Sequence, residues 1–206
     1  KLHHSCSMNK VKHPNLQYHF APVFNKYNGR KIELSQGFLL QCDQLRPKSK
    51  GEVRLKSEYP SDRPRANFNY LSHPHDIKEL REAFKKMMEL FSQPSFDEFK
   101  GNRITPSPEV KDDEDIDLWI RETATTDYHP SGTCKMGSET DSVVNQRLQV
   151  HGVENLYVVD ASVMPDIISG NLNAPTQMIA ERASDFILKK TPLKPIKANF
   201  HFQSNK

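Results

Sequence analysis

The first half of the chain shows the two-residue alternation that is typical of half-buried β-strands. Apolar and polar side chains alternate through residues 16–24 and again through residues 52–57, and residues 38–45 form another strand-like segment. Residues 46–51 lie between the last two segments and have the length of a hairpin turn. The pattern therefore predicts a mostly antiparallel sheet.

Two later segments carry the periodicity of amphipathic helices. Asp76 is followed three positions later by Glu79, a capping pattern, and apolar residues then recur at helical spacing up to Phe91. This helix is expected to lie across the sheet. Residues 112–117 are acidic, and because acids favour the positive end of a helix dipole, we interpret them as the start of a second helix rather than a metal site.

The pattern changes after residue 128. Residues 156–159 are wholly apolar, which is typical of a strand buried on both faces of a parallel sheet. An apolar stripe through residues 179–187 then predicts a helix with Pro175 near its first position. One strand and one helix do not make a domain, so we expect this unit to complete a sheet that the chain does not itself supply.

Composition favours a surface-rich fragment. Hydrophobic residues make up 35% of the 206 positions, and the mean hydropathy of −0.74 is low for a self-contained globule. Three cysteines leave one unpaired and form no Cys-x-x-Cys motif, which indicates a reducing compartment. The first residue is not methionine, so the numbering is expected to begin inside a longer protein.

The charge pattern favours a solvated surface over a nucleic-acid partner. The net charge is only +3, and the densest basic run, residues 46–56, alternates with apolar residues. We interpret this run as a solvated strand face with a basic turn, and keep attraction to a membrane surface or nucleic acid as the alternative. No apolar stretch approaches the roughly 20 residues of a membrane span.

Two loops rich in small residues carry the candidate chemistry. His129 lies between Tyr128 and the sequence Pro-Ser-Gly-Thr. Asn173 lies in Gly-Asn-Leu-Asn-Ala-Pro-Thr, which begins at Gly170. His129 is a candidate base, and Asn173 is a candidate polar partner. Together they predict a catalytic floor beneath a bound cofactor.

These motifs resemble the C-terminal signature of the glucose-methanol-choline (GMC) oxidoreductases, a family of FAD enzymes. The similarity rests on His-Pro-Ser-Gly-Thr-Cys-Lys-Met-Gly from His129, Val-His-Gly-Val-Glu-Asn-Leu-Tyr-Val-Val-Asp-Ala-Ser from Val150, and the motif from Gly170. Arg-Pro-Lys-Ser-Lys-Gly from Arg46 and Asn-Tyr-Leu-Ser from Asn69 are similar to the family's substrate domain. Within the family, the chain looks closest to choline dehydrogenases and related primary-alcohol dehydrogenases.

The resemblance implies oxidation of a primary alcohol, choline or a similar compound, to an aldehyde by hydride transfer to FAD. Hydride transfer becomes easier as the hydroxyl proton leaves, so a base with a pKa near neutrality must contact that oxygen. The resemblance gives this role to His129. It gives Asn173 the task of holding the same oxygen so that the α-hydrogen faces the flavin.

The resemblance also implies which residues bind the cofactor. A helix beginning near Ala174 would direct its unpaired N–H groups at the negative charge of reduced flavin. The backbone at Asp160 and Ala161 would approach the FAD pyrophosphate and ribityl chain, although a strand-end cap is the alternative for Asp160. The cofactor-binding set is therefore Asp160, Ala161, Asn171, Ala174, Pro175 and Thr176, and no metal site is assigned.

The implied fold class is α+β. Residues 1–127 form a substrate-binding domain with a mostly antiparallel sheet covered by helices, and residues 128–190 supply the catalytic loop with the closing strand and helix of an FAD-binding α/β domain. Residues 191–206 form a C-terminal tail. Because none of the eight glycines forms a Gly-x-Gly motif, we expect the main part of the FAD-binding domain to be absent.

Three other readings stay open. The chain could be a substrate-recognition or docking module that is inert without its N-terminal half. A metal site built from His3, His4, Cys6 and His13 is disfavoured, because these residues lie in a terminus expected to be disordered. Nucleophilic catalysis by Cys134 with the nearby histidine is also disfavoured, because no oxyanion device or third orienting group can be named.

The expected partners are a small-molecule alcohol and the missing N-terminal FAD-binding half of the same protein. The electron acceptor stays open among oxygen, a quinone and an electron carrier, and peripheral membrane association also stays open. The expected location is an intracellular reducing compartment, cytoplasmic or membrane-associated in a bacterium and mitochondrial in a eukaryote.

Overall fold

The computed structural model describes residues 2–4, 14–27, 32–191 and 193–196. The chain divides into two compact units, residues 1–127 and residues 128–206. This division falls where the substrate domain is expected to end, and the roles assigned to the two parts stay predictions. Each unit is described by itself below.

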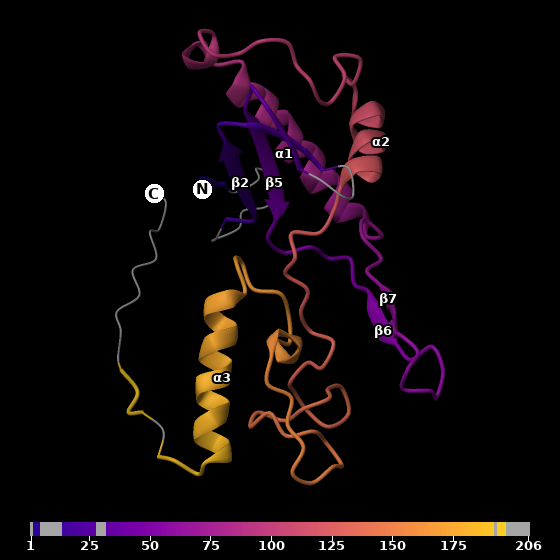
Figure 1. Ribbon diagram of the computed structural model, residues 1–206, viewed down its shortest axis with the longest axis vertical. Coiled ribbons are helices and arrows are strands. Elements are labelled where there is room, and N and C mark those ends of the chain that lie inside the picture. Colours follow the sequence, from indigo (N-terminus) through magenta and orange to yellow (C-terminus); the bar gives the residue numbers. More distant parts are fainter. Residues whose placement is uncertain (1, 5–13, 28–31, 192, 197–206) are drawn as a thin grey trace. The chain divides into compact units, whose positions relative to one another are not determined.

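The first unit contains a three-stranded antiparallel sheet with helix α1 across it (Figure 1). The strands are β1 (Leu2–His4), β2 (Leu16–Ala21) and β5 (Leu39–Gln44), in the order β1-β2-β5. Leu16 and Tyr18 pack against Ala83 of α1 (Pro74–Phe91), and the Tyr18 hydroxyl donates to the Ala83 carbonyl. The predicted antiparallel sheet and the helix lying across it are confirmed.

The remaining strands form two separate ribbons. Strand β3 (Phe24–Tyr27) pairs with β4 (Ile32–Ser35), and β6 (Glu52–Arg54) pairs with β7 (Arg65–Asn67). The expectation that residues 46–51 form a hairpin turn is therefore wrong. These residues are instead held against α1, because the backbone N–H groups of Lys48 and Ser49 donate to the Asp76 carboxylate at 2.8 and 2.7 Å.

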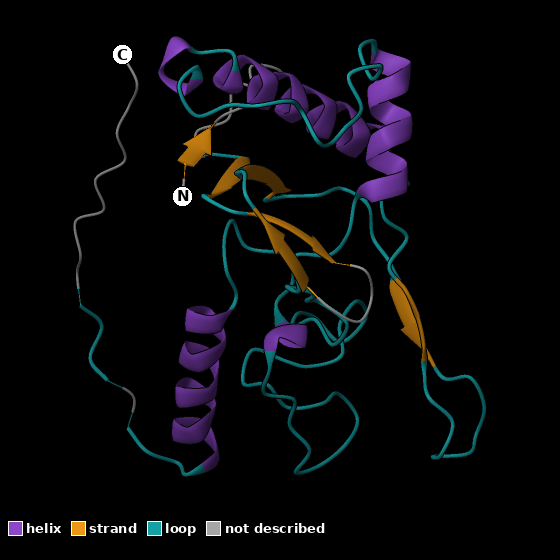
Figure 2. Cartoon of the chain, turned by 45° about the horizontal axis from the view of Figure 1, so that its top comes forward, coloured by secondary structure: helices purple, strands orange, loops and turns teal. Residues whose placement is uncertain are grey.

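Two helices form the second core of this unit (Figure 2). Helix α2 (Asp113–Thr123) begins after Asp112, whose carboxylate accepts from the N–H of Asp115, so the predicted acidic start is confirmed. Ile77 and Phe84 of α1 are buried with Ile116 and Ile120 of α2. Helix α1 is capped by His73, so the prediction that Asp76 is its cap is wrong, and Asp76 lies inside the first turn.

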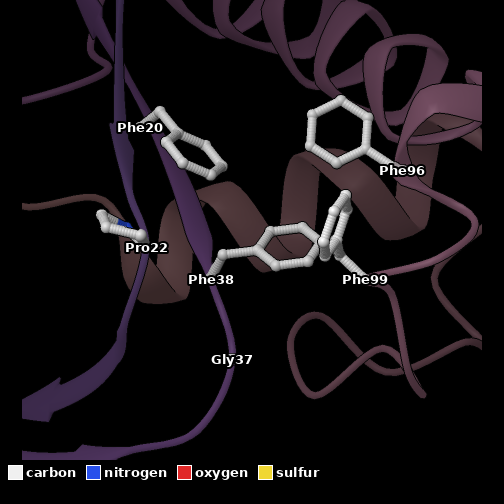
Figure 3. Close-up of a pocket in the computed structure, with 6 residues that line it drawn as sticks. All are labelled: Phe20, Pro22, Gly37, Phe38, Phe96 and Phe99. Carbon is white, nitrogen blue, oxygen red and sulfur yellow. The ribbon is translucent and has the colours of Figure 1, made fainter.

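Aromatic rings join one end of the sheet to the end of α1. The centre of the Phe38 ring lies 5.3 Å from that of the Phe91 ring and 5.6 Å from that of the Phe96 ring. Phe96 belongs to the short helix η1 (Pro94–Phe96). Figure 3 shows the apolar hollow beside these rings. It is lined by Phe20, Pro22, Gly37, Phe38, Phe96 and Phe99.

The second unit folds around a small core. Helix α3 (Asn173–Ile187) contributes Ala183, which packs with Val144, Leu148 and Val163. Val163 ends the short helix η2 (Ala161–Val163). Helix α3 was predicted, and it begins one residue earlier than expected.

The predicted strand over residues 156–159 is not formed. This segment makes one isolated antiparallel bridge, between Gln149 and Tyr157, and Leu156 is 48% exposed. A buried strand needs neighbours on both sides, and no parallel strand pairs with this segment in the described part of the chain.

Within the described residues, no helix has both the length and the apolarity needed to cross a membrane.

Candidate active site

The loop that carries His129 is fixed to η2 by its backbone. The N–H of Cys134 donates to the carbonyl of Ser162 at 3.0 Å, and the N–H of Met136 donates to that of Val163 at 2.8 Å. Gly132, between these anchors and His129, has a φ of +87°, a conformation that favours glycine. The loop is thus held to η2, whose Val163 packs in the same small core as Ala183 of α3.

The structure brings His129 and Asn171 together. The Asn171 Nδ2 atom lies 2.7 Å from His129 Nε2, although the residues are 42 positions apart. With the amide nitrogen as donor, Nε2 is the acceptor, and a neutral imidazole would then carry its ring proton on Nδ1. His129 is half-buried and Asn171 is exposed, so a small molecule can reach the pair.

Asn173 lies elsewhere. It is the first residue of α3, and its Oδ1 accepts from Gln177 Nε2, one turn further along the helix, at 2.8 Å. The helical backbone directs this side chain along the helix surface, whereas Asn171 precedes the helix and reaches His129. The geometry therefore corrects the sequence-based pairing: the amide beside the histidine is that of Asn171.

The first turn of α3 fits an anionic group. Leu172, the residue before the helix, provides no side-chain cap, and the first turn contains no acid. Pro175 has no N–H, and the N–H of Thr176 donates to the Leu172 carbonyl at 3.0 Å. The positive end of the helix dipole and the N–H groups of Asn173 and Ala174 are thus suited to the charge that reduced flavin carries.

Asp160 has a local structural role in this unit. Its Oδ1 accepts from the N–H of Ser162 at 2.8 Å and so caps η2, whose first residue is Ala161. The sequence left a strand-end cap as the alternative role of Asp160. The side chain does act as a cap, but of a short helix rather than of a strand end. The predicted approach of the Asp160 and Ala161 backbone to FAD stays a prediction.

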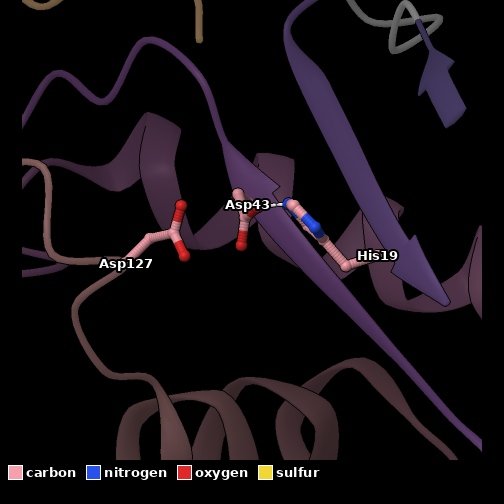
Figure 4. A group of neighbouring side chains, drawn as sticks. All are labelled: His19, Asp43 and Asp127. Atoms are coloured by element: carbon pink, nitrogen blue, oxygen red, sulfur yellow. Dashed lines mark ion pairs between the residues drawn. The ribbon is translucent and has the colours of Figure 1, made fainter. Parts of the chain in front are cut away.

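A second polar cluster was not predicted from the sequence. His19, Asp43 and Asp127 of the first unit present side-chain ligand atoms within 4.8 Å of one another (Figure 4). His19 Nε2 lies 2.5 Å from Asp43 Oδ2. Alternation places His19 on the polar face of its strand, but only the pairing of β2 with β5 brings Asp43 beside it.

Comparison with known proteins identifies the family. The GMC oxidoreductase family model matches residues 47–180. The chain belongs to the GMC oxidoreductase family. This is the family that the sequence motifs resemble, so that prediction is confirmed.

Curated relatives of this GMC oxidoreductase chain are choline dehydrogenases. It is 45% identical over 190 residues to oxygen-dependent choline dehydrogenase 1 of Chromohalobacter salexigens, covering 91% of this chain and 34% of that protein. It is 47% identical over 180 residues to oxygen-dependent choline dehydrogenase of Cronobacter sakazakii, covering 87% of this chain and 32% of that protein. The chain thus spans about a third of the length of the curated relatives it matches.

Solved structures share the fold. A formate oxidase of Aspergillus oryzae RIB40 matches with a TM-score of 0.75 at 26% identity, covering 86% of this chain and 32% of that one. Pyridoxine 4-oxidase from Mesorbium loti matches with a TM-score of 0.74 at 24% identity, covering 87% of this chain and 35% of that one. GMC oxidoreductases are FAD-dependent and act on CH–OH groups, so the cofactor implied for this chain is FAD.

Proposed function

We propose that this chain supplies the substrate domain and the catalytic floor of an FAD-dependent dehydrogenase that oxidises a primary alcohol, choline or a similar compound, to its aldehyde. The kinship with choline dehydrogenases supports the reaction class. The observation that carries the proposal is the contact of 2.7 Å between Asn171 Nδ2 and His129 Nε2 beside the uncapped start of α3.

His129 and Asn171 can share one alcohol oxygen. An oxygen about 2.8 Å from each nitrogen forms a compact triangle with them, because the nitrogens are themselves 2.7 Å apart. When the alcohol binds there, its hydroxyl replaces the Asn171 amide as the donor to the single lone pair of His129 Nε2, and the amide donates to the alcohol oxygen instead. The amide therefore stabilises the negative charge that develops on this oxygen as the proton leaves.

When bound, FAD accepts the hydride that leaves the alcohol carbon. The N–H groups of Asn173 and Ala174 at the start of α3 would stabilise the charge on the reduced ring system. Pro175 and Thr176 complete this first turn, and the backbone of Asp160 and Ala161 is proposed to contact the rest of the cofactor.

The test requires holoenzyme in which this chain is joined to the proposed N-terminal FAD-binding part. Replacement of the base, His129→Ala, should lower alcohol turnover by roughly 10²–10⁴-fold while FAD stays bound. The matched control is His151→Ala, since the His151 ring contacts Ser142 at 2.9 Å and is not part of the pair formed by His129 and Asn171. Near-normal turnover in His129→Ala, or an equal loss in the control, would contradict the assignment.

A further inference from the structure

The sheet of the first unit has two chemically different faces. Leu16 and Tyr18 of β2 pack on α1, whereas Gln17 and His19 alternate with them and lie on the other face. Asp43 of β5 is the cross-strand partner of Gln17 and lies on this second face as well. Strand pairing therefore gathers three polar side chains at one place, and Gln17 is only 3% exposed there.

Asp127, at the end of the segment that follows α2, completes the group. Figure 4 shows its carboxylate beside that of Asp43, with the His19 ring on the other side. All three ligand atoms lie within 4.8 Å of one another. The Gln17 amide is also close, because its Nε2 is 2.6 Å from His19 Nε2 and 3.5 Å from Asp43 Oδ2.

The two carboxylates of the cluster repel each other. Two carboxylates share this place with one imidazole, and the Asp43 side chain is only 18% exposed. Burial and the nearby charge of Asp127 raise the pKa of Asp43, although His19 and Gln17 partly offset them. A bound cation would remove this repulsion.

We propose that His19, Asp43 and Asp127 form a binding site for a divalent first-row metal ion of the Zn²⁺ type. One imidazole nitrogen and two carboxylate oxygens are ligands that such ions accept. Rotation of the Gln17 amide by half a turn presents Oε1 in place of Nε2 and provides a fourth, buried ligand.

Metal binding requires a small opening of the cluster. At metal–ligand distances of about 2.1 Å, neighbouring ligand atoms of a tetrahedral ion lie roughly 3.4 Å apart. The contact of 2.5 Å between His19 and Asp43 therefore lengthens by about 1 Å, and the proton that it holds is released to solvent. The ion then takes the place of that proton between the two side chains.

The ion would fasten the end of the first unit to its sheet. Asp127 is the last residue of this unit, so an ion bound here would hold the end of the segment that follows α2 against β2 and β5. The metal site does not rest on the proposed function, because none of its ligands is a proposed catalytic or cofactor-binding residue.

Calorimetric titration of the complete 206-residue chain with ZnCl₂ alone tests the site. The chain should bind one equivalent at this site, and both Asp127→Asn and His19→Gln should weaken that binding at least tenfold. The control is Asp141→Asn, because Asp141 is an exposed carboxylate that pairs with Lys135 in the other unit. Zn²⁺ should also raise the melting temperature of the wild-type chain and the control, but not of the two site variants.

Circular dichroism tests whether each variant is folded. If one of the two site variants is not, the isosteric variant Asp43→Asn is used in its place. No Zn²⁺ binding at 100 µM would overturn the proposal. Unchanged binding in all site variants would also overturn it and place the ion elsewhere, for example on His3, His4, Cys6 and His13. Binding of choline in place of Zn²⁺, lost in the same variants, would overturn it in favour of an organic cation.

Discussion

At the scale of single residues, Asp76 connects the sheet to its covering helix. Its carboxylate is 1% exposed and accepts from the backbone of Lys48 and from both the backbone and the hydroxyl of Ser49, at 2.5 to 2.8 Å. Gln44 of β5 also donates to it, at 3.2 Å. Burial raises the pKa of Asp76, but these hydrogen bonds outweigh burial and the net pKa is lowered.

Asp76→Ala should destabilise the chain by about 3 kcal/mol at pH 7, because it leaves buried donors without an acceptor. The control Asp97→Ala removes only an exposed ion pair with Lys100 and should change stability by less than about 0.5 kcal/mol. Urea unfolding measures both differences. A loss in Asp76→Ala as small as that in the control would contradict the role.

The pH dependence of the same variant follows from the lowered pKa of Asp76. A carboxylate with a lowered folded pKa contributes stability above its unfolded pKa of about 4 and loses it as the pH falls through the folded value. The stability gap between wild type and Asp76→Ala should therefore be constant from pH 7 to 5 and shrink below pH 4. A gap that grows on acidification would show that the carboxylate is not stabilised as its contacts indicate.

Sequence motifs located both loops of the candidate site but singled out Asn173 rather than Asn171, the asparagine whose side chain contacts His129. Asn171 and Asn173 lie two positions apart in one motif, and nothing in the local sequence distinguishes them. The difference depends on where α3 begins: Asn173 is inside the helix and bonds Gln177, while Asn171 precedes it and reaches His129. Helix boundaries are set by packing as well as by sequence, so this choice required the structure.

At the scale of elements, local patterns predicted the helices well and strand pairing poorly. Helices α1, α2 and α3 follow from their own periodicity, and the acidic start of α2 was also predicted, whereas the cap of α1 was not. Strand partners depend on residues far away in the chain: β5 pairs with β2 rather than β6, and Asp76 binds the backbone of Lys48 and Ser49 between β5 and β6. The cluster of His19, Asp43 and Asp127 was missed for the same reason.

The β6–β7 ribbon depends on a close backbone approach at Gly51. A Cβ atom there would lie 2.1 Å from the Asn67 carbonyl oxygen and 2.7 Å from that of Phe68. Gly51→Ala should therefore displace the start of the ribbon and destabilise the chain by about 1–3 kcal/mol. Gly101→Ala is the matched control, since no atom lies within 4 Å of the added methyl group. Equal melting temperatures for the two variants would refute this close approach.

Helices α1 and α3 should differ in local stability. Helix α1 buries five residues, including Ile77, Ala83 and Phe84, whereas α3 buries only Ala183. In the isolated chain, amide hydrogens of residues 150–188 should therefore exchange faster than those of residues 76–91. Hydrogen exchange followed by mass spectrometry resolves these segments. Equal or slower exchange in residues 150–188 would mean that the second unit has a stronger core than its burial indicates.

At the scale of the whole molecule, the chain should not bind FAD by itself. It contains no Gly-x-Gly motif, and it spans about a third of the length of the curated relatives it matches. Residues 1–206 purified alone should show no flavin absorbance after incubation with micromolar FAD. A yellow, FAD-loaded preparation would contradict this expectation.

A separate outcome concerns the alternative function. If FAD-loaded holoenzyme fails to oxidise alcohols, the chain is better described as a substrate-recognition or docking module than as part of a catalytic site.

The central claim is that Asn171, rather than Asn173, holds the alcohol oxygen beside His129. Rapid-mixing absorbance of holoenzyme at saturating alcohol measures flavin reduction directly. Asn171→Ala should slow this step by roughly 10²–10³-fold, because the donor to the developing alkoxide is lost. Asn173→Ala should leave it within about threefold of wild type, since it removes only a contact within the helix. A large loss in Asn173→Ala with a normal rate in Asn171→Ala would contradict the claim.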